Sequence, residues 1–268
     1  MAPTLFLVGC GKMGTALLSG WLEGGVARRF HVVEPAGLPA RLAACAEISW
    51  HPSAATLAAD LGPDAVVFAV KPQIIDEVLP HYRRWAQGET LFLSIVAGKT
   101  IAGFERHLGA AAIVRSMPNM AAAIGRAITV ACANSRVSEA QRRLCDRLLA
   151  GIGESAWVEE EALLDAVTAL SGSGPAYVFL LIEALARAGE KEGLSPDLAL
   201  RLAKVTVAGA GELARLAQEP PAELRQSVTS RGGTTEAALA VLMGEGGLSD
   251  LLERAVAAAA RRSRELAL

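Results

Sequence analysis

The chain has 268 residues, which at roughly 150 residues per domain corresponds to about two domains. Its 26 Lys and Arg residues against 28 Asp and Glu residues leave a net charge of −2, so the composition lacks the basic surplus used to bind nucleic acid or anionic membranes. Hydrophobic residues make up 52% and charged residues 20%, which favours an oligomer with apolar interfaces.

The sequence also lacks several kinds of segment and site. Its apolar runs, such as residues 177–182, are shorter than the roughly 18–20 residues that cross a bilayer, so we expect no membrane span. The N-terminus enters an apolar run without the basic region of a secretory signal, which predicts a cytoplasmic protein. The four cysteines form no C-x-x-C pair and the four histidines lack ligand spacing, so neither a disulfide framework nor a metal site is expected.

The first half alternates short β-branched or aromatic runs with helical stretches, a pattern typical of a parallel sheet covered by helices. The predicted strands are residues 5–8, 31–33, 65–70, 90–95, 112–115 and 128–131. The predicted helices are residues 13–23, 38–46, 74–85 and 138–150, and Ser138 is the expected N-cap of the last helix. We therefore predict a doubly wound α/β domain over residues 1–158.

From about Glu159 the pattern changes to apolar residues at helical spacing, as at Leu163, Val167 and Leu170. Clusters of Gly, Pro and Ser predict breaks between helices at residues 171–175, 193–196, 219–221, 231–233 and 244–247. Residues 159–268 are therefore predicted to form an all-helical domain.

A glycine-rich turn follows the first predicted strand and opens the first predicted helix. It reads Gly9-Cys10-Gly11-Lys12-Met13-Gly14 and fits the pattern G-x-G-x-x-G in the context that this pattern requires. We expect this turn to bind the pyrophosphate of a dinucleotide at the helix N-terminus, as in a Rossmann-type domain. A plain glycine-rich turn is the alternative, and Cys10 is expected to be a small filler and not a nucleophile.

An acidic residue ends the second predicted strand. Glu34 lies 20 residues after Gly14, where a carboxylate accepts from the ribose 2′-hydroxyl and repels a 2′-phosphate. This position favours NAD over NADP. Two alternatives stay open: Arg41 could still reach a phosphate, and Glu34 could be a solvated residue before Pro35.

Two further segments leave predicted strands at the carboxyl edge of the sheet, where open α/β sheets bind ligands. They read Ala69-Val70-Lys71-Pro72 and Met117-Pro118-Asn119. Lys71 is a candidate contact to the cofactor, and Asn119 is a candidate contact to the nicotinamide ribose or carboxamide. The alternatives are an exposed lysine at a strand end and an ordinary turn asparagine.

The helical half contains two runs rich in Ser, Thr and Gly. The first, Ser171-Gly172-Ser173-Gly174-Pro175, allows close approach of another surface at the start of a helix. The second places N–H groups and hydroxyls at the N-terminus of a helix predicted to run to Met243, which suits an anion. We expect a substrate carboxylate to bind to Ser230, Gly232, Gly233, Thr234 and Thr235. Simple N-capping beside a flexible glycine loop is the alternative.

The sequence also limits the chemistry. A carbonyl or alcohol dehydrogenase needs an acid–base group beside the reacting oxygen. In the β-hydroxyacid dehydrogenases, a lysine follows the last glycine of the second-domain motif by four positions, and Val178 occupies that position here. A cyclic imine can enter already protonated, so it needs a hydride, orientation and a hydrogen-bond partner for its nitrogen, which Thr235 would supply.

Residues 167–177 and 228–235 resemble the two signature stretches of the pyrroline-5-carboxylate reductase family. With the glycine-rich turn and the two strand-end segments, the similarity covers essentially the whole chain. The resemblance implies NAD(P)H-dependent reduction of 1-pyrroline-5-carboxylate to L-proline, the last step of proline biosynthesis, with Thr235 as the catalytic residue. It also implies a homodimer of interlocked helical domains, often assembled into larger rings, with each active site between a Rossmann domain and the helices.

The chain departs from this family at several positions. Arg231 replaces the usual proline, Glu236 replaces an aliphatic residue, Met120-Ala121 replaces Thr-Pro, and Glu34-Pro35 lacks the Ser/Arg pattern of NADP-preferring members. Two other functions stay open. One is an oxidoreductase of the same build that acts on a hydroxy acid or another cyclic imine, and the other is a non-catalytic dinucleotide-binding regulator.

Overall fold

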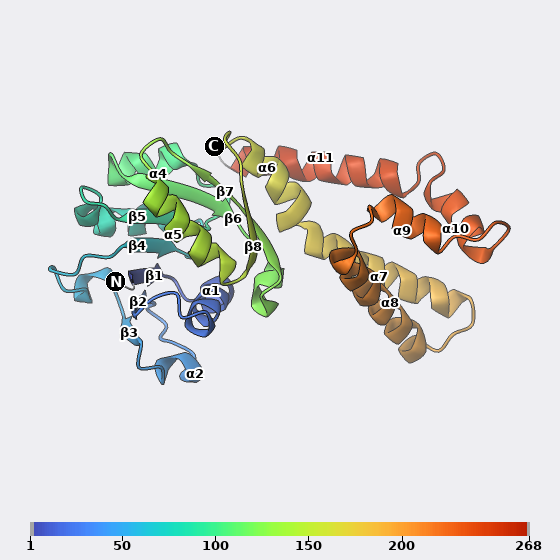
Figure 1. Ribbon diagram of the computed structural model, residues 1–268, viewed down its shortest axis with the longest axis horizontal. Helices are drawn as coiled ribbons and strands as arrows, with labels where there is room; N and C mark the ends of the chain where they lie inside the picture. Colours follow the sequence, from blue (N-terminus) through green and yellow to red (C-terminus); the bar gives the residue numbers. More distant parts are fainter. Residues whose placement is uncertain (1–2, 267–268) are drawn as a thin grey trace. The chain divides into compact units, whose positions relative to one another are not determined.

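The computed structural model describes residues 3–266 (Figure 1). The strands are β1 (Thr4–Val8), β2 (Arg29–Val33), β3 (Ile48–His51), β4 (Ala65–Phe68), β5 (Leu91–Ser94), β6 (Ala112–Met117), β7 (Ala127–Ala133) and β8 (Gly153–Trp157). The α-helices are α1 (Lys12–Glu23), α2 (Ala40–Ala43), α3 (Ile75–Val78), α4 (Ile101–Leu108), α5 (Glu139–Ala150), α6 (Leu163–Val167), α7 (Gly174–Lys191), α8 (Pro196–Leu216), α9 (Pro221–Ser227), α10 (Thr234–Leu242) and α11 (Leu248–Leu266). Short helices are η1 (Ala54–Thr56), η2 (Leu79–Trp85), η3 (Met120–Ile124) and the π-helical turn η4 (Thr168–Gly172).

Within the described residues the strands form one sheet of eight, in the order β3-β2-β1-β4-β5-β6-β7-β8. Neighbouring strands are parallel except for β6 and β7, which are antiparallel. The order of the first six is that of a doubly wound dinucleotide-binding sheet, so the predicted fold class is confirmed. Since the strand order reverses at β1 and β4, the crevice at their carboxyl ends is the expected ligand site of this fold.

The sheet is buried on both faces. Leu5 and Leu7 of β1 belong to the core cluster that α1 and α5 cover, whereas Phe6 and Val8 belong to the cluster that α3, η2 and α4 cover. Because successive strand residues point to opposite faces, covering both faces requires apolar residues at every position. This explains the continuous apolar runs from which the central strands were predicted.

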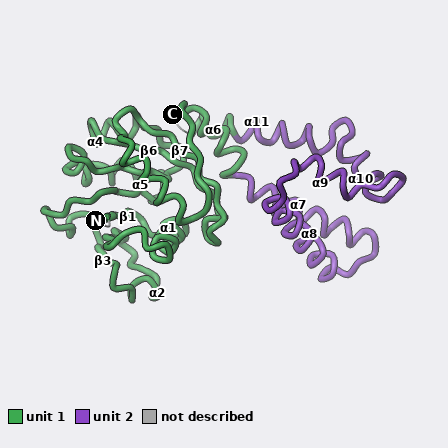
Figure 2. The backbone as a smooth tube through the Cα atoms, in the orientation of Figure 1, with its two compact units in different colours: residues 1–172, 260–268 green, residues 173–259 purple. Residues whose placement is uncertain are grey.

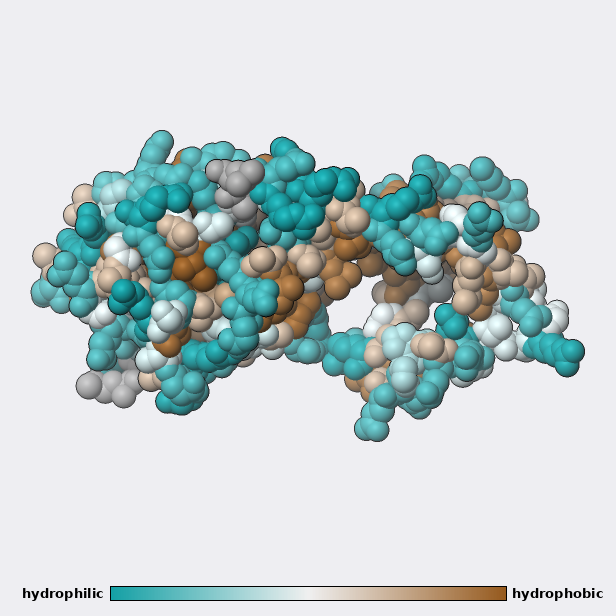
Figure 3. Space-filling view, turned by 90° about the horizontal axis from the view of Figure 1, so that it is seen from above, coloured by the Kyte–Doolittle hydropathy of each residue, from teal (hydrophilic) through white to brown (hydrophobic). Residues whose placement is uncertain are grey.

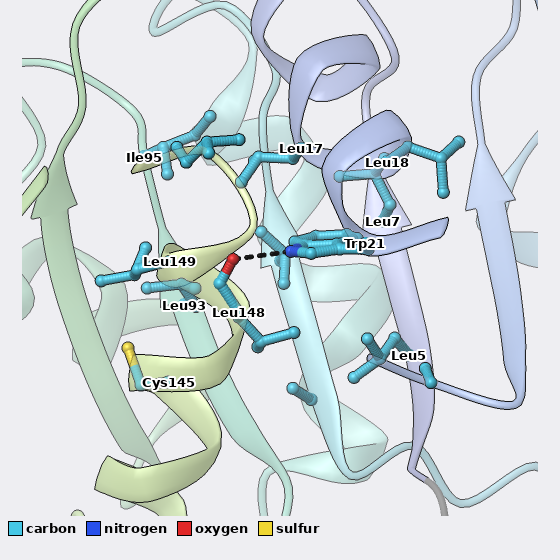
Figure 4. Packing of buried hydrophobic residues seen from close by; sticks show 14 of the residues in the cluster. Leu5, Leu7, Leu17, Leu18, Trp21, Leu93, Ile95, Cys145, Leu148 and Leu149 are labelled. Atoms are coloured by element: carbon cyan, nitrogen blue, oxygen red, sulfur yellow. Dashed lines mark hydrogen bonds between the residues drawn. The ribbon is translucent and has the colours of Figure 1, made fainter. Parts of the chain in front are cut away.

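Trp21 holds α1 against α5 (Figure 4). Its indole Nε1 donates to the carbonyl oxygen of Leu148 at 2.7 Å, which satisfies the one polar atom of a fully buried side chain. A side chain at Gly20 would overlap the carbonyl oxygen of Gly151, so the two helices pack closely where both are glycine. This packing fixes α1, whose first turn carries the glycine-rich segment.

The helical part confirms most of the predicted breaks. Residues 193–196, 219–221, 231–233 and 244–247 separate successive helices from α7 to α11. At residues 171–175 the prediction is only partly confirmed, because η4 and a bend at Ser173 join α6 to α7 in place of a loop. Pro175 is compatible with helix there because it lies in the first turn of α7, where its missing N–H has no helical partner to lose.

Several elements differ from the predictions. The strands β3 and β8 and the helix α4 were not predicted, and the helix predicted at residues 38–46 is reduced to α2. Both missed strands lie at the edges of the sheet and are largely exposed or half-buried, so they lack the apolar signal of the central strands. The helix predicted at residues 74–85 is divided into α3 and η2, and Pro80 at the start of η2 removes a helical hydrogen bond. Ser138 caps α5 as predicted, in a capping box with Gln141.

The chain divides into two compact units (Figure 2). One runs to Gly172 and includes the end of α11 from Ala260, and the other is Ser173–Ala259. The domain boundary predicted between residues 158 and 159 stays a prediction.

The second unit has many exposed apolar side chains (Figure 3). Phe179 on α7 is 54% exposed and Val205 on α8 is 66% exposed. The continuous helical stretch Leu163–Lys191 is long and apolar enough, by length and composition alone, to cross a membrane. The uninterrupted apolar runs in the sequence are shorter than this helical stretch, because the charged residues Glu183 and Arg187 interrupt the runs but do not end the helix. Exposed apolar surface of this extent indicates contact with another chain or with lipid.

Candidate functional site

A cavity of about 690 Å³ lies at the carboxyl ends of β1, β2 and β4. Its lining includes Gly9 and Gly11 of the glycine-rich turn, Glu34 after β2, and residues 69–71 after β4. The segment at residues 52–55, after β3, and side chains of α3 and η2 complete it. The structure therefore brings together three of the segments that the sequence assigned to cofactor binding.

Each of the three glycines in the turn lacks a side chain for a different geometric reason. Gly9 has a φ of +93°, and a Cβ there would lie 2.8 Å from the carbonyl group of Ala69. A Cβ at Gly14 would overlap the carbonyl oxygen of Gly9, so α1 packs tightly on the turn. A Cβ at Gly11 would meet no atom within 4 Å, which leaves open space at the N-terminus of α1. A pyrophosphate-binding turn requires a tight bend, a backbone that the phosphates can approach closely, and a helix packed closely on the turn. These three glycines meet those requirements, so the turn fits a dinucleotide.

Glu34 connects β2 to the glycine-rich turn. Its Oε2 accepts from the backbone N–H of Cys10 at 2.8 Å, and its Oε1 accepts from the backbone N–H of Ala36 at 3.1 Å. Each carboxylate oxygen has a further lone pair, so Glu34 can hold the turn and still accept from a ribose hydroxyl. The carboxylate is half-buried in the cavity lining, where a 2′-phosphate would meet a like charge.

The other residues expected to bind the cofactor differ in their surroundings. Lys71 is exposed and lines the cavity, whereas Pro72 is not among the lining residues. Lys12 is exposed, and Met13 packs against the core beneath α1. Burial raises the pKa of the Cys10 thiol, which lies 3.6 Å from Thr15 Oγ1, so the thiol is poorly suited to act as a nucleophile.

Asn119 lies after β6 and caps η3. Its Oδ1 accepts from the backbone N–H of Ala121, and its Nδ2 donates to Ser171 Oγ, each at 3.2 Å. Ser171 belongs to the π-helical turn, so the structure joins the Met117–Asn119 segment to the first Ser/Gly run. A Cβ on Gly172 would lie 2.6 Å from Met117 Cε, so a side chain there would displace the end of the Met117 side chain.

The loop expected to bind the substrate carboxylate precedes α10 in the second unit. Gly232 has a φ of +71°, and its N–H donates to Glu236 Oε2 at 2.7 Å. The N–H of Gly233 donates to the carbonyl oxygen of Ser230 at 3.0 Å. Two of the expected donors therefore already have acceptors, Ser230 in the loop and Glu236 in the first turn of α10. Among residues 3–266, the hydroxyls of Ser230, Thr234 and Thr235 have no hydrogen-bond partner.

The part of the cavity lining at residues 52–55 and on α3 and η2 was not predicted from the sequence. The segment at 52–55 follows β3, and its position depends on the pairing of β3 with β2, which a polar edge strand does not signal. Over the described residues, no group of three His, Cys, Asp or Glu side chains is placed to hold a metal ion.

Comparisons with known proteins identify both parts of the chain. A family model described as "Pyrroline-5-carboxylate reductase dimerisation" matches residues 161–266, and one described as "NADP oxidoreductase coenzyme F420-dependent" matches residues 4–98. The dimerisation domain indicates a homo-oligomer, and it contains the exposed apolar side chains of α7 and α8.

Several relatives match over nearly their full length. The pyrroline-5-carboxylate reductase of Pseudomonas aeruginosa is 41% identical, over 99% of this chain and 97% of the relative, and that of Pisum sativum is 38% identical, over 98% and 96%. The structure of a pyrroline-5-carboxylate reductase from Coxiella burnetii superposes with a TM-score of 0.91 at 32% identity, and covers both chains completely. The Plasmodium falciparum enzyme, solved with NADP bound, gives a TM-score of 0.83 at 29% identity, over 99% of this chain and 98% of that one. With this sheet, this glycine-rich turn and this coverage, the chain belongs to the pyrroline-5-carboxylate reductase family, oxidoreductases of proline biosynthesis.

Proposed function

We propose that this chain reduces 1-pyrroline-5-carboxylate to L-proline with a reduced nicotinamide dinucleotide held in the cavity at β1, β2 and β4. The supporting observation is the glycine-rich turn, where Gly9, Gly11 and Gly14 each meet a separate requirement of pyrophosphate binding. The turn opens onto the cavity that Glu34 and Lys71 also line. Family membership gives the substrate class.

In this proposal the chain contributes positioning, which can supply most of the rate for a substrate that arrives as a protonated imine. When bound, the reduced nicotinamide supplies a hydride to C5 of the pyrroline ring. Ser230, Gly232, Gly233 and Thr234 bind the substrate carboxylate at the N-terminus of α10. Thr235 orients the ring nitrogen through its unpaired hydroxyl. The Gly232 N–H already donates to Glu236, so the substrate carboxylate shares or displaces that acceptor.

The proposed preference is for NADH over NADPH. It is supported by Glu34, which the N–H of Cys10 holds in the cavity lining, close to the expected site of the ribose 2′-hydroxyl. The Plasmodium falciparum relative has NADP bound, so we assign the preference to this residue and not to the family. Lys71, Asn119 and the remaining residues of the turn are proposed to contact the cofactor.

The proposed assembly is a homodimer formed through the helical domain, residues 159–268, with further assembly of these dimers into larger rings. The proposed location is the cytoplasm. Size-exclusion chromatography with light scattering measures the mass of the assembly, and a monomer would contradict the proposal.

The function is tested by following NADH and NADPH oxidation with 1-pyrroline-5-carboxylate while detecting proline. Thr235→Ala should lower kcat/KM by at least tenfold and leave dinucleotide binding unchanged, and Thr235→Ser should restore most of the activity because it keeps the hydroxyl. An unchanged kcat/KM in Thr235→Ala would remove Thr235 from the mechanism. Oxidation of neither cofactor, with no proline formed, would overturn the function itself.

A further inference from the structure

Four consecutive residues, 52–55, form one wall of the cavity at β1, β2 and β4. They follow the end of β3, and the residues on either side of them are joined by a hydrogen bond, in which His51 Nδ1 lies 3.3 Å from Thr56 Oγ1. This bond closes the four residues into a loop. The shape of the wall therefore depends on two side chains that do not themselves line the cavity.

The direction of each hydrogen bond around this loop can be assigned. The Thr56 hydroxyl donates to the carbonyl oxygen of Ser53 at 2.8 Å, because a carbonyl oxygen can only accept. Its one hydrogen is then committed, so Thr56 Oγ1 accepts from His51 and the hydrogen between them is on His51 Nδ1. Burial lowers the pKa of His51, so the ring is neutral near pH 7 and its Nε2 carries no hydrogen.

His31 on β2 fixes this tautomer of His51. Its Nδ1 lies 3.0 Å from His51 Nε2, so the bare Nε2 accepts the N–H of His31. His31 is 9% exposed and meets Phe6 edge-on, with ring centroids 5.2 Å apart, which holds its ring in place. The hydrogen bonds therefore run in one direction, from His31 through His51 and Thr56 to the carbonyl oxygen of Ser53.

The strand order indicates which part of a dinucleotide this wall would meet. The pyrophosphate is assigned to the glycine-rich turn after β1, and the adenosine ribose to Glu34 after β2. Since β3 lies beside β2 at the edge of the sheet, the loop after β3 lies on the adenosine side of Glu34. The end of β3 also holds Glu34 itself, because the N–H of Glu34 donates to the carbonyl oxygen of His51 at 3.0 Å, and Trp50 Nε1 donates to the carbonyl oxygen of Glu34 at 2.9 Å.

We propose that His51 is a positioning residue of the dinucleotide site, which holds residues 52–55 closed beside the adenosine half of the cofactor through its hydrogen bond to Thr56. This inference rests on the proposed function, since it takes the cavity as the cofactor site. His51 acts through the loop that it closes and touches no reacting atom. Without the bond the loop must be ordered when the dinucleotide binds, and the entropy lost in ordering it reduces the affinity.

The test is calorimetric titration of the full chain with ADP-ribose, which has the adenosine half of the cofactor but no nicotinamide. Thr56→Val keeps the shape of the side chain and removes the hydroxyl, so it should bind ADP-ribose about three- to tenfold more weakly. Thr90→Val is the matched control, because the Thr90 hydroxyl also donates to a carbonyl oxygen at 2.8 Å, that of Pro63, and neither residue lines the cavity. The control should bind ADP-ribose as the wild type does, even if it unfolds at a lower temperature.

Two substitutions of His51 separate its two side-chain hydrogen bonds. His51→Asn places an amide N–H near the position of Nδ1 and keeps the bond to Thr56, so it should retain most of the affinity for ADP-ribose. His51→Gln places its amide near the position of Nε2, which keeps the bond to His31 and loses the bond to Thr56. It should therefore bind ADP-ribose as weakly as Thr56→Val does.

Three results would overturn the inference while leaving the cofactor cavity in place. The first is equal ADP-ribose affinity in Thr56→Val and wild type. The second is a His51→Gln variant that binds as tightly as His51→Asn or more tightly. The third is a loss of affinity in Thr90→Val as large as that in Thr56→Val, because affinity would then follow stability and not the loop. If the wild type binds neither ADP-ribose nor NADH, the proposed function fails as well.

Discussion

The carboxylate of Glu236, in the first turn of α10, accepts a hydrogen bond from an N–H group that the substrate carboxylate is proposed to use. Glu236 Oε2 accepts from the N–H of Gly232 at 2.7 Å, four residues earlier. Replacing Glu236 with alanine frees this N–H and removes a negative charge from the N-terminus of α10. We expect the KM for 1-pyrroline-5-carboxylate to fall while kcat stays within about twofold, since the change acts on ground-state and transition-state binding alike.

The size of the effect follows from the exposure of the pair. A hydrogen bond to a charged group contributes about 1.5–3 kcal/mol when shielded, but Glu236 is exposed, and solvent reduces this to about 1 kcal/mol. That free energy corresponds to about a fivefold lower KM. The same substitution removes a favourable charge from a helix N-terminus, which costs about 0.5 kcal/mol of folding stability.

The chain offers a matched control. Asp250 Oδ2 accepts from the N–H of Gly246 at 2.7 Å, also four residues earlier, and Gly246 has a φ of +69° where Gly232 has +71°. Asp250→Ala should therefore lose the same stability without changing KM. Steady-state kinetics and thermal unfolding of the two variants separate the effects. A KM that is unchanged or higher in Glu236→Ala, or that changes equally in both variants, would refute the competition between Glu236 and the substrate.

Three further predictions concern the first unit. Because of Glu34, we expect a higher kcat/KM with NADH than with NADPH, and Glu34→Ser should reduce the ratio; a tenfold preference of the wild type for NADPH, about 1.4 kcal/mol, would contradict this. Gly11→Ala should keep the wild-type unfolding temperature and lose dinucleotide affinity in a fluorescence titration, whereas Gly14→Ala should also lose about 1–3 kcal/mol of stability, because its Cβ overlaps the backbone. Burial lowers the pKa of both His31 and His51 in the folded chain. As the pH falls below the ordinary histidine pKa near 6.5, the unfolded chain therefore binds more protons than the folded chain, and the free energy of unfolding should decrease. Denaturant unfolding between pH 7 and 5.5 should show this decrease, and a variant with glutamine at both positions should show a smaller one.

Much of the fold could be predicted because its signals are local. Most positions in the strands of the sheet centre are apolar, and the N-cap at Ser138 and the glycine-rich turn each occupy a few consecutive residues. The edge strands β3 and β8 could not be predicted in this way. Their place depends on pairing with β2 and β7, and only part of their surface is buried.

The candidate site likewise has parts that could be predicted from the sequence and parts that could not. The sequence by itself identified the glycine-rich turn, Glu34 and the Ser230–Thr235 loop, because each is a short run whose residue types suit one chemical group. Only the tertiary structure showed that Glu34 accepts from the N–H of Cys10, 24 residues earlier, and that Tyr82 borders the same cavity. Both observations depend on which groups come into contact when the chain folds and water leaves the interior. A polar group's partner can come from any part of the chain, so its identity is decided by packing and not by its sequence neighbours.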